Sequence, residues 1–424
     1  MLFMNQKAII IVHPFTSENF LYKTVHERGY KIITLITKFD QNWIKLCMDT
    51  VNKYSDFTLN VTNDVATDLI VIKKLLSDNQ LELKGVINAF DYSLEYSDSL
   101  TNELLHADID LKYSKIRCNK YDVNDLLAKN SQIPAIKSIL IENEPNWQED
   151  LSNKLQDFKY PVIIKPDSNS AARNNMAQAA NFKEVIKYLN TLLTRSSPFS
   201  DQSHSRFIIQ EYIEGVEFFV NAVALGGQHK IAGVFKYVKD KRKHLCVVSL
   251  SDECAQEIQK LLGYHNQCMQ HLCFTYGMVH SEYIIDPTGQ PYLIEVNNRL
   301  AGADCPYLSN KCYHSDEINL FLDLLENKND ITEFNYKQLF SYAAVPFLYN
   351  YVNPNATGLD LAHITSEHGL VVFRSGLSVA SSHDNGDVFD KPAAAIWKLN
   401  DSLHILTQEL HTLRNLEQTG KLFV

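Results

Sequence analysis

The feature that most constrains the fold is a predicted β-hairpin in segment 277–304, which reads GMVHSEYIIDPTGQPYLIEVNNRLAGAD. Two apolar runs flank Asp286–Gly289 (DPTG), and these residue types are typical of a tight turn. The pattern therefore predicts two antiparallel strands. Because successive side chains of a strand point to opposite faces, Glu295 and Asn297 are expected to project from one face.

A third acidic residue of this segment, Glu282, lies thirteen positions before Glu295 on the partner strand, where cross-strand pairing can bring it alongside. Two carboxylates and an amide oxygen are hard ligands that suit Mg²⁺ bridging the phosphates of a nucleotide. Arg299 can place a fixed cation where charge develops on a migrating phosphoryl group. His280 shares the face of Glu282, and contact with substrate or phosphate and a structural role are equally open for it.

The alternative for this segment is that Glu295 and Asn297 only face solvent on an edge strand. A single Glu-x-Asn pair favours that alternative. The full pattern Glu…Glu-x-Asn-x-Arg-x-x-Gly, which runs from Glu282 to Gly302, favours a metal site instead.

The amino-terminal residues predict an open parallel α/β domain. Ala8–Val12 (AIIIV) is typical of a buried strand, Phe20–Arg28 has helical spacing, and Lys31–Ile36 (KIITLI) is typical of a second strand. Gly29 is placed to end the helix. A strand, a helix and a strand within about thirty residues form a βαβ unit, which implies a parallel sheet. No G-x-G-x-x-G follows the first strand, so dinucleotide binding there has no support.

The rest of the chain divides into two further zones. Strand candidates of the second zone are Pro161–Lys165, Arg206–Gln210, Phe218–Leu225 and Gln290–Val296. The third zone alternates short β-like runs with turns and ends in a helix near Ser402–Glu417. We therefore predict an α/β domain over 1–115, a central α+β domain over 116–330 and a small β-rich subdomain with a terminal helix over 331–424.

Composition excludes several classes of function. The 424 residues carry a formal net charge of −10, which argues against general nucleic-acid binding, because that needs a basic face. None of the eight cysteines forms a Cys-x-x-Cys pair, so buried thiols of a reducing compartment are expected. The apolar run Ala8–Val12 is too short for a signal peptide or a membrane span. We expect a cytoplasmic protein that does not bind membranes.

The segment 277–304 resembles the metal-binding end of the ATP-grasp superfamily. In that superfamily an acidic residue, a Glu and an Asn hold Mg²⁺, and the resemblance implies that Glu282, Glu295 and Asn297 are those ligands. Arg299 falls where these ligases keep an arginine near the transferred phosphate. The resemblance implies an ATP-grasp fold: an amino-terminal parallel α/β domain, a central two-part domain that holds the nucleotide, and a small β-rich subdomain.

Other parts of the superfamily pattern occur in the same order. Lys120, in Arg117–Tyr121 (RCNKY), stands where relatives have an ATP-binding lysine, and Lys165 ends a strand as does the lysine that reaches the α- and β-phosphates. The loop 166–175 (PDSNSAARNN), with Ser170 near its middle, would cover the triphosphate with backbone N–H groups. This loop has no glycine, unlike most relatives, so it closes differently or holds the nucleotide less tightly.

The segment Gln210–Glu217 (QEYIEGVE) resembles the hinge that holds adenine and ribose. By resemblance, Gln210 offers its side-chain carbonyl to the adenine amino group. Backbone groups of Glu211 and Ile213 read the purine edge, and Glu217 accepts from the ribose hydroxyls. A strand followed by a polar turn is the alternative for this segment.

The amino-terminal half narrows the choice of ligase. His13–Asn19 (HPFTSEN) and Asp91–Leu105 look like the L-amino-acid ligase branch, which implies an ATP- and Mg²⁺-dependent carboxylate–amine ligase that forms dipeptides or amide metabolites through an acyl phosphate. An ordinary α/β segment is the alternative for these residues. The implied partners are small-molecule substrates and, by analogy with relatives, a second copy of the chain. A peptide or protein acceptor, and a nucleotide-binding regulator with weak catalysis, remain as rival functions.

Overall fold

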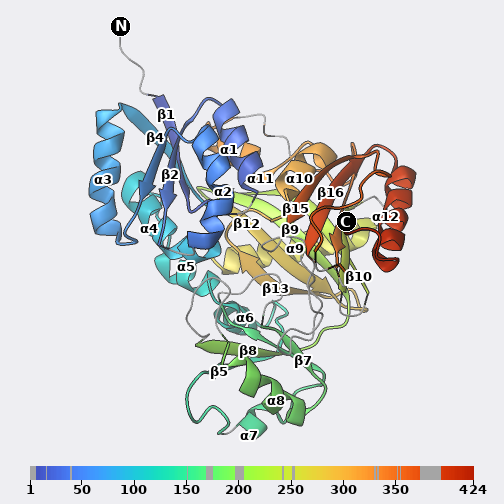
Figure 1. Cartoon of the computed structure of the whole chain (residues 1–424). Coiled ribbons are helices and arrows are strands. Elements are labelled where there is room, and N and C mark those ends of the chain that lie inside the picture. The colour runs from blue at the N-terminus through green and yellow to red at the C-terminus, as the bar shows by residue number, and fades with distance from the viewer. Residues whose placement is uncertain are drawn as a thin grey trace.

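The structure is a computed structural model that describes residues 6–15, 17–38, 41–149, 151–168, 175–195, 205–240, 243–250, 254–328, 331, 334–350, 352–353, 355–372 and 393–424. Within these residues the strands form three sheets with helices packed around them (Figure 1). Across the same ranges, no helix has the length and apolar character that a bilayer crossing requires. All eight cysteines are free thiols.

The first sheet is parallel and comes from the amino-terminal zone. Its strands, in spatial order, are β3 (Phe57–Asn60), β2 (Lys31–Ile36), β1 (Gln6–Val12) and β4 (Leu81–Asn88). The helices around it are α1 (Glu18–Glu27), α2 (Gln41–Tyr54), α3 (Val65–Asp78) and α4 (Leu94–Leu105), and the 3₁₀ turn η1 (Asp91–Ser93) precedes α4. Ile9 packs toward α1 while Ile10 packs toward α3 and α4, so both faces of β1 are buried. The predicted βαβ unit is confirmed.

The second sheet is antiparallel and forms a small lobe, at the bottom of Figure 1. Its strands, in spatial order, are β5 (Ser138–Glu142), β8 (Arg206–Glu211), β6 (Val162–Pro166) and β7 (Ala177–Ala179), and its helices are α7 (Leu151–Leu155) and α8 (Phe182–Leu192). Val162, Ile164 and Ile209 pack against α8. The side chains on the other face of β6 and β8 therefore point away from the core of this lobe and can contact other parts of the molecule.

The third sheet is antiparallel and lies in the middle of the molecule (Figure 1). Its strands, in spatial order, are β13 (Pro291–Asn297), β12 (Tyr276–Ile285), β9 (Val216–Leu225), β10 (Gln228–Asp240), β11 (Lys243–Ser249), β14 (Tyr342–Leu348), β16 (Ala394–Asn400) and β15 (Glu367–Val372). The remaining helices are α5 (Leu111–Arg117), α6 (Lys120–Ala128), α9 (Ala255–His271), α10 (Cys305–Tyr313), α11 (Glu317–Leu325) and α12 (Leu403–Gln418).

Helices cover both faces of the central sheet. Val220 and Val279 pack with α6 and α9 on one face, and Phe219 packs with α10 on the other. The carboxy-terminal strands β14, β15 and β16 extend this same sheet rather than forming one of their own. The boundaries proposed at 115 and 330 remain predictions, but the third zone shares its hydrogen-bonded sheet with the second.

Candidate active site

The predicted hairpin is formed by β12 and β13. In its register Glu282 lies directly opposite Glu295, and His280 lies opposite Asn297. Glu282 Oε1 accepts a hydrogen bond from the Tyr237 hydroxyl at 3.0 Å. Glu295 Oε1 accepts one from Asn297 Nδ2, also at 3.0 Å. The predicted cross-strand meeting of the two carboxylates is confirmed, and Tyr237 is a further member of the cluster that carries no sequence motif.

The donor set of this cluster fits a magnesium ion shared with phosphate. Two carboxylates directly opposite each other repel unless a cation is near, and Lys120 Nζ, 3.4 Å from Glu295 Oε2, supplies only part of that charge. Mg²⁺ usually takes one or two protein carboxylates and completes its shell with water and phosphate. The described residues hold no group of three or more His, Cys, Asp or Glu side chains that could bind a metal unaided. Glu282, Glu295 and Asn297 are therefore suited to a metal–nucleotide site rather than to a closed metal cage.

Lys165 reaches this cluster from the small lobe. It alternates along β6 with Val162 and Ile164, which belong to the lobe core, so it points the other way. Its side chain is buried, and its Nζ donates a hydrogen bond to the Ile294 carbonyl of β13 at 3.4 Å. The structure thus brings the strand lysine of one sheet to the acidic edge strand of another.

Lys120 is held next to Lys165 by Asp167. The backbone N–H of Lys120, the first residue of α6, donates to the Asp167 carbonyl at 2.9 Å, and that of Tyr121 donates to Asp167 Oδ1 at 2.6 Å. Arg206 lies 3.1 Å from the other carboxylate oxygen of Asp167. Asp167 was not among the predicted site residues. Its only signal is an acidic residue two positions after the strand lysine.

The charges of the cluster shift its protonation equilibria. Burial, and then the nearby charge of Lys120, lower the pKa of Lys165 to about 8. Burial raises the pKa of Glu295, but Lys120 and Lys165 outweigh burial and hold that pKa at about 2. Burial, together with the charge of Glu282, raises the pKa of Tyr237, so its hydroxyl stays protonated and donates. The site therefore keeps carboxylate and ammonium groups in contact at neutral pH.

We expect nucleotide affinity to fall as the pH rises above 8. The pKa of Lys165 is lowered to about 8, so Lys165 is a cation below that pH and becomes neutral above it. Between pH 7 and pH 9 the Kd for ADP, measured by calorimetry without Mg²⁺, should rise by up to about tenfold. The Lys165→Arg variant keeps its charge over this range and should show a much flatter profile. The same slope in both proteins would contradict the role of Lys165.

Arg299 follows β13 and connects the hairpin to the amino-terminal domain. Its Nε donates to Asp91 Oδ2 at 2.7 Å, and its Nη1 donates to the Leu300 carbonyl at 2.8 Å. Asp91 opens η1, just after the parallel strand β4. No role was predicted for Asp91, whose partner lies 208 positions away along the chain.

The residues of the predicted adenine hinge lie along β8 and at the start of β9. Gln210 shares the face of Lys165, and its buried Nε2 has no hydrogen-bond partner within the described part of the chain. Glu211 donates its backbone N–H to the Lys137 carbonyl at 3.0 Å, so that N–H cannot also read a purine edge.

Ile213 and Glu217 lie beyond Glu211, toward the central sheet. Ile213 is half-buried in the connection between β8 and β9, and Glu217 forms an ion pair with Lys239. A ribose at Glu217 would share this carboxylate with Lys239. The hinge roles stay predictions.

Of the two remaining predicted residues, Ser170 and His280, the structure describes only His280. Ser170 lies outside the described residues, as does most of the glycine-free loop. His280 is buried; its Nδ1 lies 2.9 Å from Asn221 Oδ1, its ring packs edge-on against Phe219, and its Nε2 lies 3.5 Å from Glu282 Oε1. These contacts place His280 beside the acidic cluster.

A cavity of about 290 Å³ opens beside these residues, between the amino-terminal domain and the edge of the central sheet. Lys120, Glu295, Asn297 and Arg299 line one side of it. Its other side is formed mainly by the amino-terminal domain and the start of α6, with the lining residues Phe15, Phe90, Asp91, Tyr92, Leu94, Glu95, Arg117, Cys118, Asn119 and Val123. Two of the predicted metal ligands, Glu295 and Asn297, and the predicted arginine thus face a space of the size of a small ligand.

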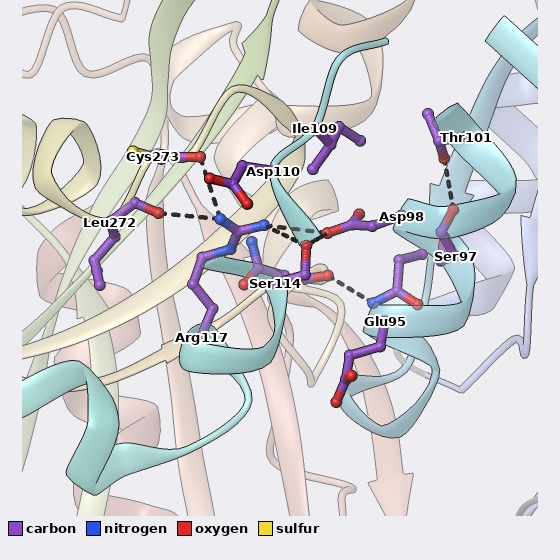
Figure 2. Close-up of polar contacts among 12 residues, drawn as sticks. Glu95, Ser97, Asp98, Thr101, Ile109, Asp110, Ser114, Arg117, Leu272 and Cys273 are labelled. Atoms are coloured by element: carbon purple, nitrogen blue, oxygen red, sulfur yellow. Dashed lines mark hydrogen bonds and ion pairs between the residues drawn. The ribbon is translucent and has the colours of Figure 1, made fainter. Parts of the chain in front are cut away.

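Arg117 supports the floor of this cavity. Figure 2 shows its guanidinium between the Asp98 carboxylate and two main-chain carbonyls. Nη2 lies 3.1 Å from Asp98 Oδ2, and Nη1 donates to the Leu272 and Cys273 carbonyls at 3.0 and 3.2 Å. Ser114 Oγ donates to the same Asp98 oxygen at 2.6 Å. Through these contacts Arg117 joins α4, α5 and the turn after α9.

Comparisons with known proteins agree with this geometry. Residues 158–306 match the model of the ATP-grasp domain, a range that includes Lys165, Gln210 and the whole hairpin site. Dapdiamide A synthase from Enterobacter agglomerans is 24% identical over 253 residues, which are 58% of this chain and 58% of that protein. The chain therefore spans less than two thirds of the length of this relative.

Solved structures share the fold over nearly the whole chain. The L-amino acid ligase from Bacillus licheniformis has a TM-score of 0.72 at 14% identity, covering 97% of this chain and 98% of that one. An N5-carboxyaminoimidazole ribonucleotide synthetase solved with ADP has a TM-score of 0.69 at 14% identity, covering 98% of both chains. Together with the domain match, this likeness confirms the predicted fold class. The chain therefore contains an ATP-grasp domain, over residues 158–306.

Proposed function

We propose that the protein is an ATP- and Mg²⁺-dependent ligase that activates the carboxylate of an amino acid and joins it to an amine. The observation that supports this best is the cavity of about 290 Å³ whose wall combines Lys120, Glu295, Asn297 and Arg299. A carboxylate in this cavity would lie beside the residues suited to Mg²⁺ and beside Arg299. Acyl phosphate chemistry requires this juxtaposition.

The proposed reaction has two steps. A substrate carboxylate oxygen attacks the γ-phosphorus of ATP, the bond from that phosphorus to the ADP oxygen breaks, and an acyl phosphate and ADP form. The amine nitrogen then adds to the acyl carbon, the carbon–oxygen bond to phosphate breaks, and an amide, inorganic phosphate and a proton are released. Both steps move negative charge between oxygens, so cationic groups held in place beforehand lower their barriers.

The residues of the site divide this work. Lys120 and Lys165 bind the triphosphate, and Asp167 holds them in one arrangement. Arg299 stabilises the charge on the phosphoryl group as it moves to the substrate. Mg²⁺, when bound by Glu282, Glu295 and Asn297, supplies charge neutralisation on the phosphates. Gln210, Glu211, Ile213 and Glu217 would hold adenosine.

A free amino acid fits this cavity better than a peptide or protein. A volume of about 290 Å³ is at the lower end of the range for small-molecule sites, whereas a peptide acceptor needs a long groove. The likeness to an L-amino acid ligase supports the same substrate class. A homodimer, expected from the resemblance, stays a prediction.

The first test is phosphate release from ATP and Mg²⁺ by the purified protein, with each amino acid alone and with all pairs. We expect release that requires particular pairs, and a product whose mass is the sum of the two amino acids less one water. The Glu295→Gln variant, which loses a ligand charge, should be inactive and guards against contaminating ATPases. If no pair causes phosphate release while calorimetry shows that ATP binds, the proposal of a free amino acid as substrate would be contradicted. Peptide acceptors would then be tested, and the absence of phosphate release with them as well would favour a nucleotide-binding regulator.

A further inference from the structure

The ion pair between Asp91 and Arg299 is open on the side of the cavity. Both residues line it, and Asp91 is the more accessible, with 38% of its side chain exposed against 13% for Arg299. Asp91 uses only Oδ2 for Arg299. Its other oxygen, Oδ1, is buried and has no hydrogen-bond partner within the described part of the chain. A carboxylate oxygen without a donor is unusual in a folded protein and calls for one.

Arg299 is also only partly satisfied. Its Nε donates to Asp91 and its Nη1 donates to Leu300, while Nη2 makes no hydrogen bond within the described part of the chain. A guanidinium can bind a carboxylate through two N–H groups, so donors remain for a substrate acid. Arg299, which has spare donors, and Asp91, which has a spare acceptor, thus lie side by side at one cavity wall. Arg299 Nε is 2.7 Å from Asp91 Oδ2.

We propose that Asp91 selects the acid substrate by its ammonium group. This inference rests on the proposed ligase function. An α-amino acid carries a carboxylate and an ammonium on one carbon atom, so its two charges match Arg299 and Asp91 side by side. The carboxylate lies against Arg299, where phosphoryl transfer takes place, and the ammonium donates to Asp91. A small rotation of the Asp91 carboxylate, whose terminal torsion is soft, turns Oδ1 toward the ligand.

The wall around Asp91 also limits the side chain of this substrate. Phe90 and Tyr92 stack with ring centroids 4.8 Å apart, and Phe15 packs against Phe90 at the same distance. All three rings line the cavity. An apolar side chain placed next to the ammonium would bury its surface against these rings, which is favourable, whereas a charged one would lose hydration. The preferred acid substrate is therefore an α-amino acid with an apolar side chain.

Glu95 is the competing acceptor, because it is a second carboxylate at the cavity. It is exposed to solvent, and Arg299 pairs with Asp91, not with Glu95. An ammonium at Glu95 would be largely hydrated and would gain little from that contact. Asp91 is next to the arginine that receives the carboxylate, so the structure favours Asp91.

The test measures activation alone, with hydroxylamine as the trapping amine. Hydroxylamine displaces phosphate from the acyl phosphate and gives a coloured hydroxamate. L-phenylalanine, L-leucine and L-alanine are each compared with the acid that lacks the amino group: 3-phenylpropanoate, 4-methylpentanoate and propanoate. The readout is the ratio of kcat/KM within each pair, for the wild type and for the Asp91→Asn and Glu95→Gln variants. Asparagine can still accept from Arg299 Nε, so Asp91→Asn removes the charge and keeps the contact.

We expect the wild type to prefer the amino acids, most strongly those with apolar side chains, and Asp91→Asn to lower that preference by about tenfold to a hundredfold. Glu95→Gln should keep most of it. Equal ratios in the wild type and Asp91→Asn, with kcat lowered for all acids alike, would show that Asp91 only positions Arg299 and would overturn the inference. Loss of preference in Glu95→Gln alone would overturn it as well. Hydroxamate from the des-amino acids only would overturn it while leaving the ligase function intact, whereas hydroxamate from no acid would remove the ligase function itself.

Discussion

Replacing Arg299 by alanine should lower kcat for ligation by about a hundredfold or more, which corresponds to roughly 3 kcal/mol, and should leave the Kd for ATP nearly unchanged. Arg299 faces the cavity and its neighbours anchor it through Nε and Nη1, so its charge is in place before phosphate moves. A cation that acts mainly on the charge of the transition state affects turnover more than ground-state binding. The measurement is steady-state phosphate release, with ATP affinity from calorimetry.

Lys74→Ala is the matched control for loss of one positive charge. Lys74 lies on α3, its side chain is 73% exposed, and it pairs only with Asp78 in the same helix. It should turn over as the wild type does. Arg299→Lys should recover only part of the loss, because an ammonium cannot reproduce the fixed fork of a guanidinium. Wild-type turnover in Arg299→Ala would show that the proposed role of this residue is wrong.

Replacing Asp98 by alanine should reduce the free energy of unfolding by about 3–5 kcal/mol. The side chains of Asp98 and Arg117 are 7% and 2% exposed, so the variant leaves a guanidinium buried without its counter-ion. Burial is the largest influence on both partners: it raises the pKa of Asp98 and lowers that of Arg117. The carbonyls of Leu272 and Cys273 (Figure 2) cannot replace the lost charge. Urea unfolding followed by fluorescence measures the change.

Two further variants separate charge from packing in this prediction. Asp125→Ala removes a partly exposed carboxylate from its ion pair with Lys129, the residue that follows α6, and should leave the unfolding midpoint unchanged. The double variant Asp98→Leu/Arg117→Met replaces the buried pair by apolar side chains and should regain much of the stability lost in Asp98→Ala. A double variant as unstable as Asp98→Ala would show that the shape of the network, and not an unpaired charge, accounts for the loss.

Local patterns in the sequence were enough to predict much of the fold. Lys31–Ile36 is a strand with the predicted bounds, and Gly29 adopts φ 80° at the end of α1, as a helix stop requires. The hairpin was predictable because turn residues and alternating side chains fix its register over a short stretch of chain. The register next to the turn pairs Tyr283 with Leu293, and a bulge then shifts it by one residue, so that Glu282 lies opposite Glu295.

The features of the site that could not be predicted from the sequence depend on contacts between distant segments. Asp91 meets Arg299 across 208 positions, and Asp167 meets Tyr121 across 46. Such contacts leave no local pattern in the sequence, because they arise from the way the sheets pack against one another. The pairing of β14 with β11, whose sequence lies about a hundred positions earlier, is a contact of the same kind.

The link through Asp167 has a consequence for how this protein can change over evolution. Asp167 does not line the cavity, yet it connects the end of the strand that bears Lys165 with the start of the helix that bears Lys120. Its substitution would keep the main-chain contact with Lys120 but would remove the side-chain contacts with Tyr121 and Arg206 that support this arrangement. Nucleotide affinity can thus change through substitution of Asp167, which does not line the cavity, while the residues that line the cavity remain the same.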